Sequence, residues 1–174
     1  MTDRVLRRFD QLHWISARGM RPVFRLWHYP ARGAWQTWVL FCSRPLINHG
    51  PPLIRHGLWD RAADLDRLKR DQRRQPDVRP ALAIRETAIA DEALSPLLDE
   101  ASRLDLPPWG VVHPFTCHEV GEYGIEGYAS RPTIWVVWNP PVPLWVRPIA
   151  RWADHVRQEF RTALDGEGQA ALAK

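Results

Sequence analysis

Apolar residues recur along this chain in two patterns, and the patterns predict which stretches are strands and which are helices. Runs rich in aromatic and β-branched residues predict strands, whereas apolar residues three or four positions apart predict helices. The predicted strands are residues 22–29, 35–43, 53–59, 80–89, 122–129 and 133–139. The predicted helices are residues 4–15, 60–74 and 144–164. A further helix opens at Asp91 or Ser95, and Pro96 favours a regular part that begins near Ser95.

This order of elements predicts the fold class. Strands joined by short hairpins favour antiparallel pairing, and helices separated from them favour an α+β, two-layer sandwich. We therefore expect a mostly antiparallel, Trp-rich sheet with helices packed mainly on one face. The 174 residues fit a single domain, with residues 1–20 as an N-terminal helical arm. Gly166 is the expected stop of the last helix, so that residues 166–174 form a loose tail.

Two predicted strands carry large apolar groups on both faces. A sheet covered on one face alone shows alternating apolar and polar residues, yet Trp35 and Trp38 fall on opposite faces of one strand, and Trp135 and Trp138 of the other. In the favoured interpretation the N-terminal helix or a loop covers the second face. The alternative is an exposed aromatic patch that binds a protein or a second copy of the chain, because Trp is enriched at such anchors.

Composition narrows the class of protein further. The chain has ten Trp, and only two Cys, at positions 42 and 117. Residues 1–19 are interrupted by charges and lack the apolar core of a secretory signal, and no apolar run reaches the length of a membrane span. These features predict free thiols, a cytoplasmic location and no membrane partner.

The charge is distributed unevenly. Residues 1–80 carry a net charge of +9 and residues 81–174 a net charge of −5. The basic part is a candidate surface for nucleic acid. The stretch 85–126 holds nine acidic residues against two basic ones, which suits a basic protein partner such as a nuclease.

Candidate chemistry is sparse. His113, Cys117 and His118 are metal-ligand types close together, but structural zinc sites pair Cys-x-x-Cys with a second ligand pair, so core or loop packing is the favoured interpretation. No nucleophile elbow, phosphate-binding Gly loop or His-Glu-x-x-His motif occurs. We expect no cofactor and no catalytic residue. Asp60 is expected to cap the helix that follows it, and Asp64 to lie in solvent.

Four segments resemble uncharacterised bacterial small α+β proteins, some of them immunity-like proteins encoded near toxins. The segments are Gly57-Leu58-Trp59-Asp60-Arg61, Leu104-Asp105-Leu106-Pro107-Pro108, residues 121–128 and Ile134-Trp135-Val136-Val137-Trp138-Asn139-Pro140-Pro141. Residues 121–128 resemble a Gly-x-Asp-Gly-x-x-Tyr strand, and Glu126 stands where Asp is more usual in that strand. The resemblance implies a fold and offers no catalytic residues.

The sequence thus favours a non-enzymatic protein-binding domain, in one form an immunity-like protein that neutralises a toxin or effector. A protein partner or self-association is expected, and nucleic acid ranks below it. A metal-dependent enzyme around His113, Cys117 and His118 is the last alternative. The candidate partner-binding residues are Trp38, Trp135, Glu119, Glu122 and Glu126.

Overall fold

The computed structural model describes residues 19–43, 50–70, 81–104, 121–128 and 134–172. Some of the predictions fall elsewhere in the chain. The N-terminal helix predicted for residues 4–15 lies outside the described residues, as do the metal-ligand candidates near residue 117. Within the described residues, no helix is both long enough and apolar enough to cross a lipid bilayer.

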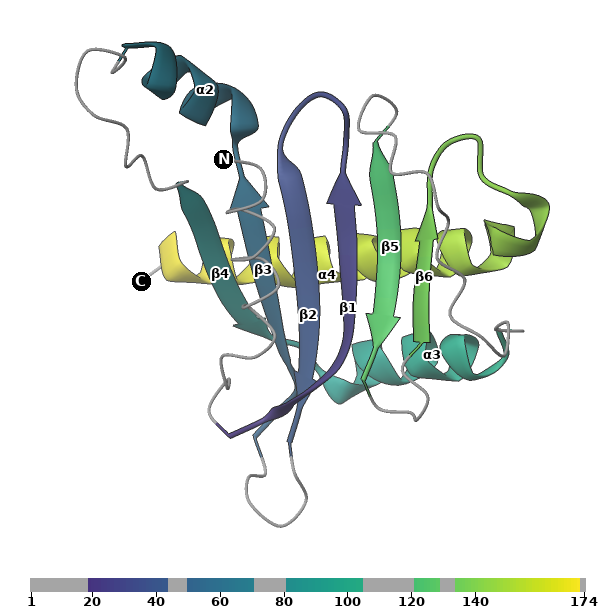
Figure 1. The fold of residues 1–174 in the computed structure, drawn as a ribbon. Helices are drawn as coiled ribbons and strands as arrows, with labels where there is room; N and C mark the ends of the chain where they lie inside the picture. Colours follow the sequence, from purple (N-terminus) through teal and green to yellow (C-terminus); the bar gives the residue numbers. More distant parts are fainter. Residues whose placement is uncertain (1–18, 44–49, 71–80, 105–120, 129–133, 173–174) are drawn as a thin grey trace.

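A six-stranded antiparallel sheet forms the centre of the fold (Figure 1), in the order β4-β3-β2-β1-β5-β6. The sequence prediction of six strands is confirmed to within two residues at each end. Strands β1 to β4 pair in chain order, with Gly33 at positive φ in the β1–β2 turn, whereas β5 pairs with β1. The strands are β1 (Arg21–Tyr29), β2 (Trp35–Cys42), β3 (Leu53–Trp59), β4 (Leu82–Ala88), β5 (Glu122–Gly127) and β6 (Ile134–Trp138).

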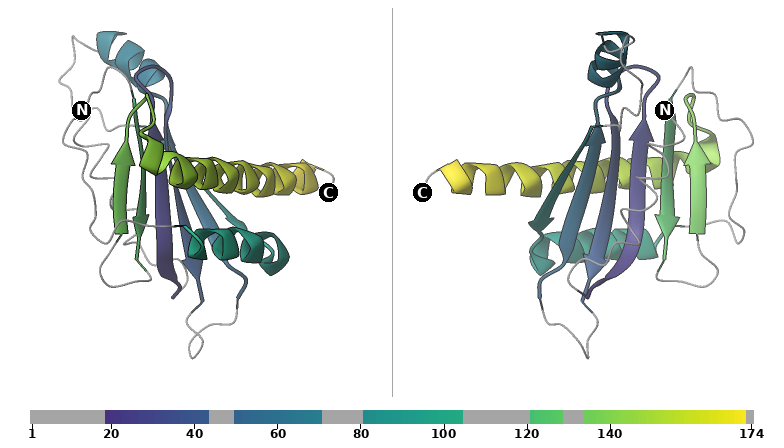
Figure 2. Two further views of the ribbon diagram at one scale, coloured as in Figure 1. Left: turned by 90° about the vertical axis from the view of Figure 1, so that its right-hand side faces the viewer. Right: turned by 60° about the vertical axis from the view of Figure 1, so that its left-hand side comes forward.

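Two helices cover one face of this sheet, which confirms the predicted α+β class. The described helices are α2 (Arg61–Arg70), α3 (Asp91–Ser102), the short η1 (Leu144–Val146) and α4 (Arg147–Leu172). Figure 2 shows α3 and α4 on the same side of the sheet, while α2 lies beyond the end of β3. We call the side under α3 and α4 the helix face, and the opposite side the second face.

The apolar stripe of α4 packs across the helix face. Six residues at helical spacing form this stripe, and all of them are buried: Ile149, Trp152, Ala153, Val156, Phe160 and Leu164. Phe160 stacks on Phe24 of β1 with ring centroids 6.0 Å apart, and Trp152 meets the same ring edge-on at 5.4 Å. The Trp152 indole N–H donates to the carbonyl oxygen of Leu97 at 2.8 Å, which fixes α4 against α3.

Two predicted helix boundaries are wrong. The helix α4 continues through Gly166 to Leu172, so the residues up to 172 are helical rather than a loose tail. Among the described residues, positive φ is confined to Gly19, Gly33 and Gly121. Gly166 therefore keeps a right-handed backbone, and one helical glycine costs only about 1 kcal/mol, too little to end a long packed helix.

The other boundary concerns α3, which begins at Asp91, the first of the two predicted openings, and contains Pro96. The prediction of a regular start near Ser95 gave too much weight to the proline. Leu94 and Leu97 are both buried against the core. Their burial requires the first turn, and it outweighs the hydrogen bond that Pro96 cannot donate.

The helix α2 also differs from its prediction. Its start is as expected, because the Asp60 carboxylate accepts from the amide of Ala63 at 3.0 Å. Ala62 and Leu65 lie at the spacing that predicts an inward apolar stripe, yet both are exposed. Asp64, expected in solvent, is buried and accepts from the Trp59 indole at 2.7 Å, and it pairs with Arg67 at 2.9 Å. A buried indole N–H needs an acceptor, and Asp64 supplies it.

Large side chains are also buried on the second face, which confirms that β2 and β6 are apolar on both faces. One cluster contains Trp27, Tyr29, Trp35, Trp59 and Val137, and another contains Met20, Val39, Phe41 and Leu53. The described helices α3 and α4 lie on the other side (Figure 2). The N-terminal helix that the sequence assigns to this face remains a prediction, because it lies outside the described residues.

The backbone at Gly124 leaves no room for a side chain on the second face. A Cβ atom built there would lie 2.0 Å from the Trp27 ring, closer than any real contact. The indole of Trp27 therefore lies directly over the β5 backbone, where any side chain would displace it. This site contrasts with Gly166, where an added Cβ meets nothing within 4 Å.

We expect Gly124→Ala to lower the free energy of unfolding by about 3 kcal/mol, because Trp27 must move within a packed cluster. Gly166→Ala should raise it by about 1 kcal/mol through helix propensity. Urea unfolding followed by Trp fluorescence measures both. Equal effects of the two substitutions would show that the Trp27 contact is not a constraint.

Candidate functional site

Three rings stand in a row on the helix face of the sheet, one each from β1, β5 and β6. The strand register places Trp138 of β6 opposite Tyr123 of β5, and Tyr123 opposite His28 of β1. The His28 and Tyr123 rings stack with centroids 4.2 Å apart and planes 14° apart. Tyr123 and Trp138 are 6.0 Å apart with planes at 12°. The row fixes the Tyr123 ring from both sides, so this part of the sheet is preorganised.

The polar side of α4 lies over this row and forms a cleft with it. The cleft has a volume of about 320 Å³ and is lined by His28, Tyr123, Asp154, Arg157, Gln158 and Arg161. Residues 154, 157, 158 and 161 recur at helical spacing, so they share one side of α4. A cleft of this size falls at the lower end of the range for small-molecule sites.

Two arginines set the chemistry of the cleft. The guanidinium of Arg157 lies 5.2 Å from the Tyr123 ring centroid, and that of Arg161 lies 5.6 Å from the Trp38 ring centroid. Arg161 also donates to the Gln36 side-chain oxygen at 3.4 Å. Both guanidiniums therefore rest on aromatic rings of the sheet, which orients their remaining N–H groups.

The cleft is positively charged at neutral pH. Arg157 is buried and its described carboxylate partner is Asp154, one turn earlier on α4. No described carboxylate lies within ion-pair distance of Arg161, which is exposed. Burial lowers the pKa of Arg157, and Asp154 opposes that shift. Burial, with Arg157 and Arg161 adding to it, lowers the pKa of His28 to about 4, so His28 is neutral and the lining carries a net charge of about +1.

A second neutral histidine lies beside the cleft. His56 of β3 pairs with Trp38 of β2, and their rings stack 5.1 Å apart. Burial, followed by the charges of Arg85 and Arg161, lowers the pKa of His56 to about 4. The Trp38 Nε1 and His56 Nε2 atoms are buried and have no hydrogen-bond partner among the described residues. Two buried polar atoms without a hydrogen-bond partner therefore belong to the ring pair that lies beneath Arg161.

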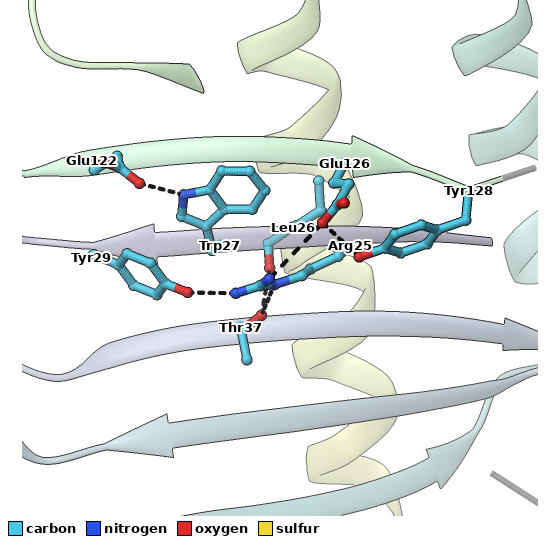
Figure 3. A network of polar contacts seen from close by, with 8 residues as sticks. All are labelled: Arg25, Leu26, Trp27, Tyr29, Thr37, Glu122, Glu126 and Tyr128. Atoms are coloured by element: carbon cyan, nitrogen blue, oxygen red, sulfur yellow. Dashed lines mark hydrogen bonds and ion pairs between the residues drawn. The ribbon is translucent and has the colours of Figure 1, made fainter. Parts of the chain in front are cut away.

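The second face holds a separate polar network around Arg25 (Figure 3). The buried Arg25 guanidinium donates to the Thr37 hydroxyl at 3.1 Å and to the Tyr29 hydroxyl at 2.8 Å. Its carboxylate partner Glu126 lies 3.9 Å away and accepts from the Tyr128 hydroxyl at 2.6 Å. Burial and Glu126 raise the pKa of Tyr128 far above its usual range, so that its proton stays in place. The network satisfies a buried charge and is a structural element of the sheet.

The residues predicted from the sequence to bind a partner are spread over both faces. Trp38 is fully buried under α4, whereas Trp135 is 48 % exposed on the second face, opposite Glu126 in the β5–β6 register. Glu122 lies on the same face as Glu126 and accepts from the Trp27 indole at 2.8 Å. Trp38 and Trp135 therefore cannot contribute to one continuous surface.

The remaining candidates cannot be placed. Glu119 and the metal-ligand candidates His113, Cys117 and His118 lie outside the described residues. The described part of the chain contains no group of three or more side chains able to hold a metal ion.

Sequence reasoning missed the cleft residues His28, Arg157 and Arg161. One signal was available, because Arg157 and Arg161 are four residues apart and border the apolar stripe of the last helix. The sheet side of the cleft could not be predicted from the sequence, since His28 and Tyr123 are 95 positions apart and meet only through the β1–β5 pairing.

Comparison of the whole chain with protein-family models, with curated proteins and with solved structures finds no match.

The two histidines predict an acid-sensitive fold. Their pKa in the folded protein, about 4, is below the ordinary value of 6.5, so protons bind the unfolded chain more tightly. The stability that they contribute is complete above about pH 6.5 and is lost as the pH falls toward about 4. We expect His28→Gln and His56→Gln each to flatten the decline of the urea midpoint between these pH values.

A wild-type profile in both His28→Gln and His56→Gln would show that neither ring is held neutral by the fold.

Proposed function

We propose that the protein is a non-enzymatic binding domain that holds a small anionic ligand in the cleft between β1, β5 and α4. The observation that carries this proposal is the pair of arginines on one side of α4. Arg157 and Arg161 both line the cleft, and a single described carboxylate, Asp154, lies with them. The lining therefore retains an unbalanced positive charge that a ligand can neutralise.

The position of Arg157 strengthens an interaction with an anion. Its guanidinium is buried, so its charge is poorly screened by solvent and attracts a negative group more strongly than a surface arginine does. A guanidinium also presents N–H groups in a planar fork that matches carboxylate and phosphate oxygens. The neutral His28, the Tyr123 hydroxyl and the Gln158 amide add hydrogen-bonding groups that need no change of charge.

The stacked rings favour binding because they already restrict the side chains of the cleft, so that less conformational entropy is lost when a ligand binds. Tyr123 lies between His28 and Trp138, and the two guanidiniums rest on Tyr123 and Trp38. Side chains held in place before binding lose less freedom when the ligand arrives. The cleft is thus supported by both the sheet and the helix.

Protein binding through Trp135 is a second candidate function, in line with the expectation of a protein partner or an immunity-like role. Its support is that Trp135 is half exposed on the edge strand β6. Tryptophan is enriched among the residues that contribute most to binding in protein interfaces. A partner recovered from the native host by the wild type and not by Trp135→Ala would support this function, and equal recovery would oppose it.

The anion proposal is tested by titration. We expect inorganic phosphate or sulfate to bind saturably, measured by calorimetry and by shifts of the Trp indole N–H signals in NMR spectra. Arg161→Gln should weaken binding about tenfold or more, because it removes a charge-assisted contact. Arg151→Gln removes an exposed arginine of the same helix outside the cleft, and it should leave binding unchanged.

Two results would contradict the anion proposal. The first is a wild-type protein that shows no saturable anion binding. The second is an equal loss in Arg151→Gln and Arg161→Gln, which would indicate a general effect of net charge.

A further inference from the structure

The two side chains of the Arg157–Asp154 ion pair differ in solvent exposure, and this difference indicates the class of ligand. The Asp154 side chain is 69 % exposed, whereas that of Arg157 is 8 % exposed. The two are three residues apart on α4, and both line the cleft. The carboxylate therefore reaches a buried cation from the solvent side, where a ligand would also enter.

We propose that the ligand is a small phosphate monoester and that its phosphate replaces Asp154 on Arg157. This inference rests on the proposed function, because it assigns the ligand of the same cleft. In the free protein the Asp154 carboxylate occupies the position of the ligand's anion. On binding, the phosphate oxygens take the N–H groups of Arg157 and Arg161, and Asp154 turns into solvent.

The exchange is favourable because its cost falls on an exposed group. Asp154 is already largely hydrated, so its return to solvent costs that carboxylate little. Arg157 cannot be left alone, since a buried cation without a counter-charge is strongly unfavourable. The ligand must therefore supply at least the charge that Asp154 withdraws.

The charge balance selects a dianion. With Asp154 turned away and His28 neutral, Arg157 and Arg161 give the cleft a charge of about +2. A monoanion would only substitute for Asp154 and leave the cleft at about +1, as before. A phosphate monoester carries close to two negative charges at neutral pH and brings the cleft near neutrality.

The number of oxygens also favours phosphate. A monoester has three terminal oxygens arranged around phosphorus, enough for both guanidinium forks and one further donor. A single carboxylate has two oxygens in one plane and suits one fork. A volume of about 320 Å³ leaves room for a small organic group on the ester oxygen, beside the Tyr123 and His28 rings.

The phosphodiesters of nucleic acid backbones are a different class of ligand. Each carries one negative charge and two terminal oxygens, so it meets neither the charge nor the donor requirement of this cleft. The basic residues 1–80 remain a separate candidate for such contacts.

The substitution Asp154→Asn tests the inference. It keeps the shape of the side chain and removes the competing charge, so inorganic phosphate should bind about fivefold more tightly than to the wild type. Glu159→Gln removes the same charge from α4 outside the cleft lining and is the matched control. We expect less than a twofold change in that variant.

Three other probes, each titrated by calorimetry near pH 8, where phosphate is largely dianionic, test the ligand class. Succinate is a dianion with carboxylates, acetate is a carboxylate monoanion, and dimethyl phosphate is a diester monoanion. Phosphate should bind at least about tenfold more tightly than each of these.

The outcomes separate this inference from the proposed function. Equal gains in Asp154→Asn and Glu159→Gln, or no gain in Asp154→Asn, would overturn the displacement of Asp154. Binding of dimethyl phosphate or succinate as tight as that of phosphate would overturn the monoester assignment. In both cases an Arg161-dependent anion site would still stand, whereas a wild type that binds no anion removes both proposals.

Discussion

The packing of α4 across the sheet is the interaction on which the rest of the structure depends. One side of this helix inserts Trp152, Val156 and Phe160 into the core. The same turns hold Arg157 over the Tyr123 ring and Arg161 over the Trp38 ring. Because burial of the apolar stripe fixes the rotation of the helix about its axis, it also fixes where the two guanidiniums point. Core packing and the charge of the cleft are therefore set by one contact.

Each face of the sheet has a buried arginine, and the two arginines differ in how their charge is balanced. On the second face, Arg25 is surrounded by hydroxyl oxygens and has a carboxylate partner nearby, so its charge is balanced within the chain (Figure 3). On the helix face, Arg157 relies on a carboxylate that is mostly in solvent. A buried cation with a stable partner contributes structure, while one with an exchangeable partner can contribute recognition. The proposed function follows from that difference.

The parts of the fold that depend on local periodicity were predictable from the sequence, and those that depend on pairing were not. The strands and the inward face of α4 follow from residue spacing, and Asp60 caps α2 as expected. Asp64 was assigned to solvent because a helix carboxylate usually lies there. Its burial depends on the Trp59 indole, which no spacing rule reveals.

The cleft was not predictable for a related reason. It joins His28 of β1, Tyr123 of β5 and the polar border of α4, and sequence alone does not show that β5 pairs with β1. The sequence instead indicated Trp38 and Trp135 as binding residues, although Trp38 is enclosed by the core and Trp135 lies on the other face.

The Trp27–Gly124 contact has a consequence for how the two halves of the sheet align. Strand β5 joins the sheet after a long intervening stretch of chain, so nothing local sets its position against β1. A shift by two residues would keep the same faces but bring Glu122 or Glu126 beneath the Trp27 indole, where only a residue without a side chain fits. Gly124 thus fixes the register of β5 against β1. The position of Tyr123 beside His28 therefore depends on the absence of a Cβ atom at the next residue, Gly124.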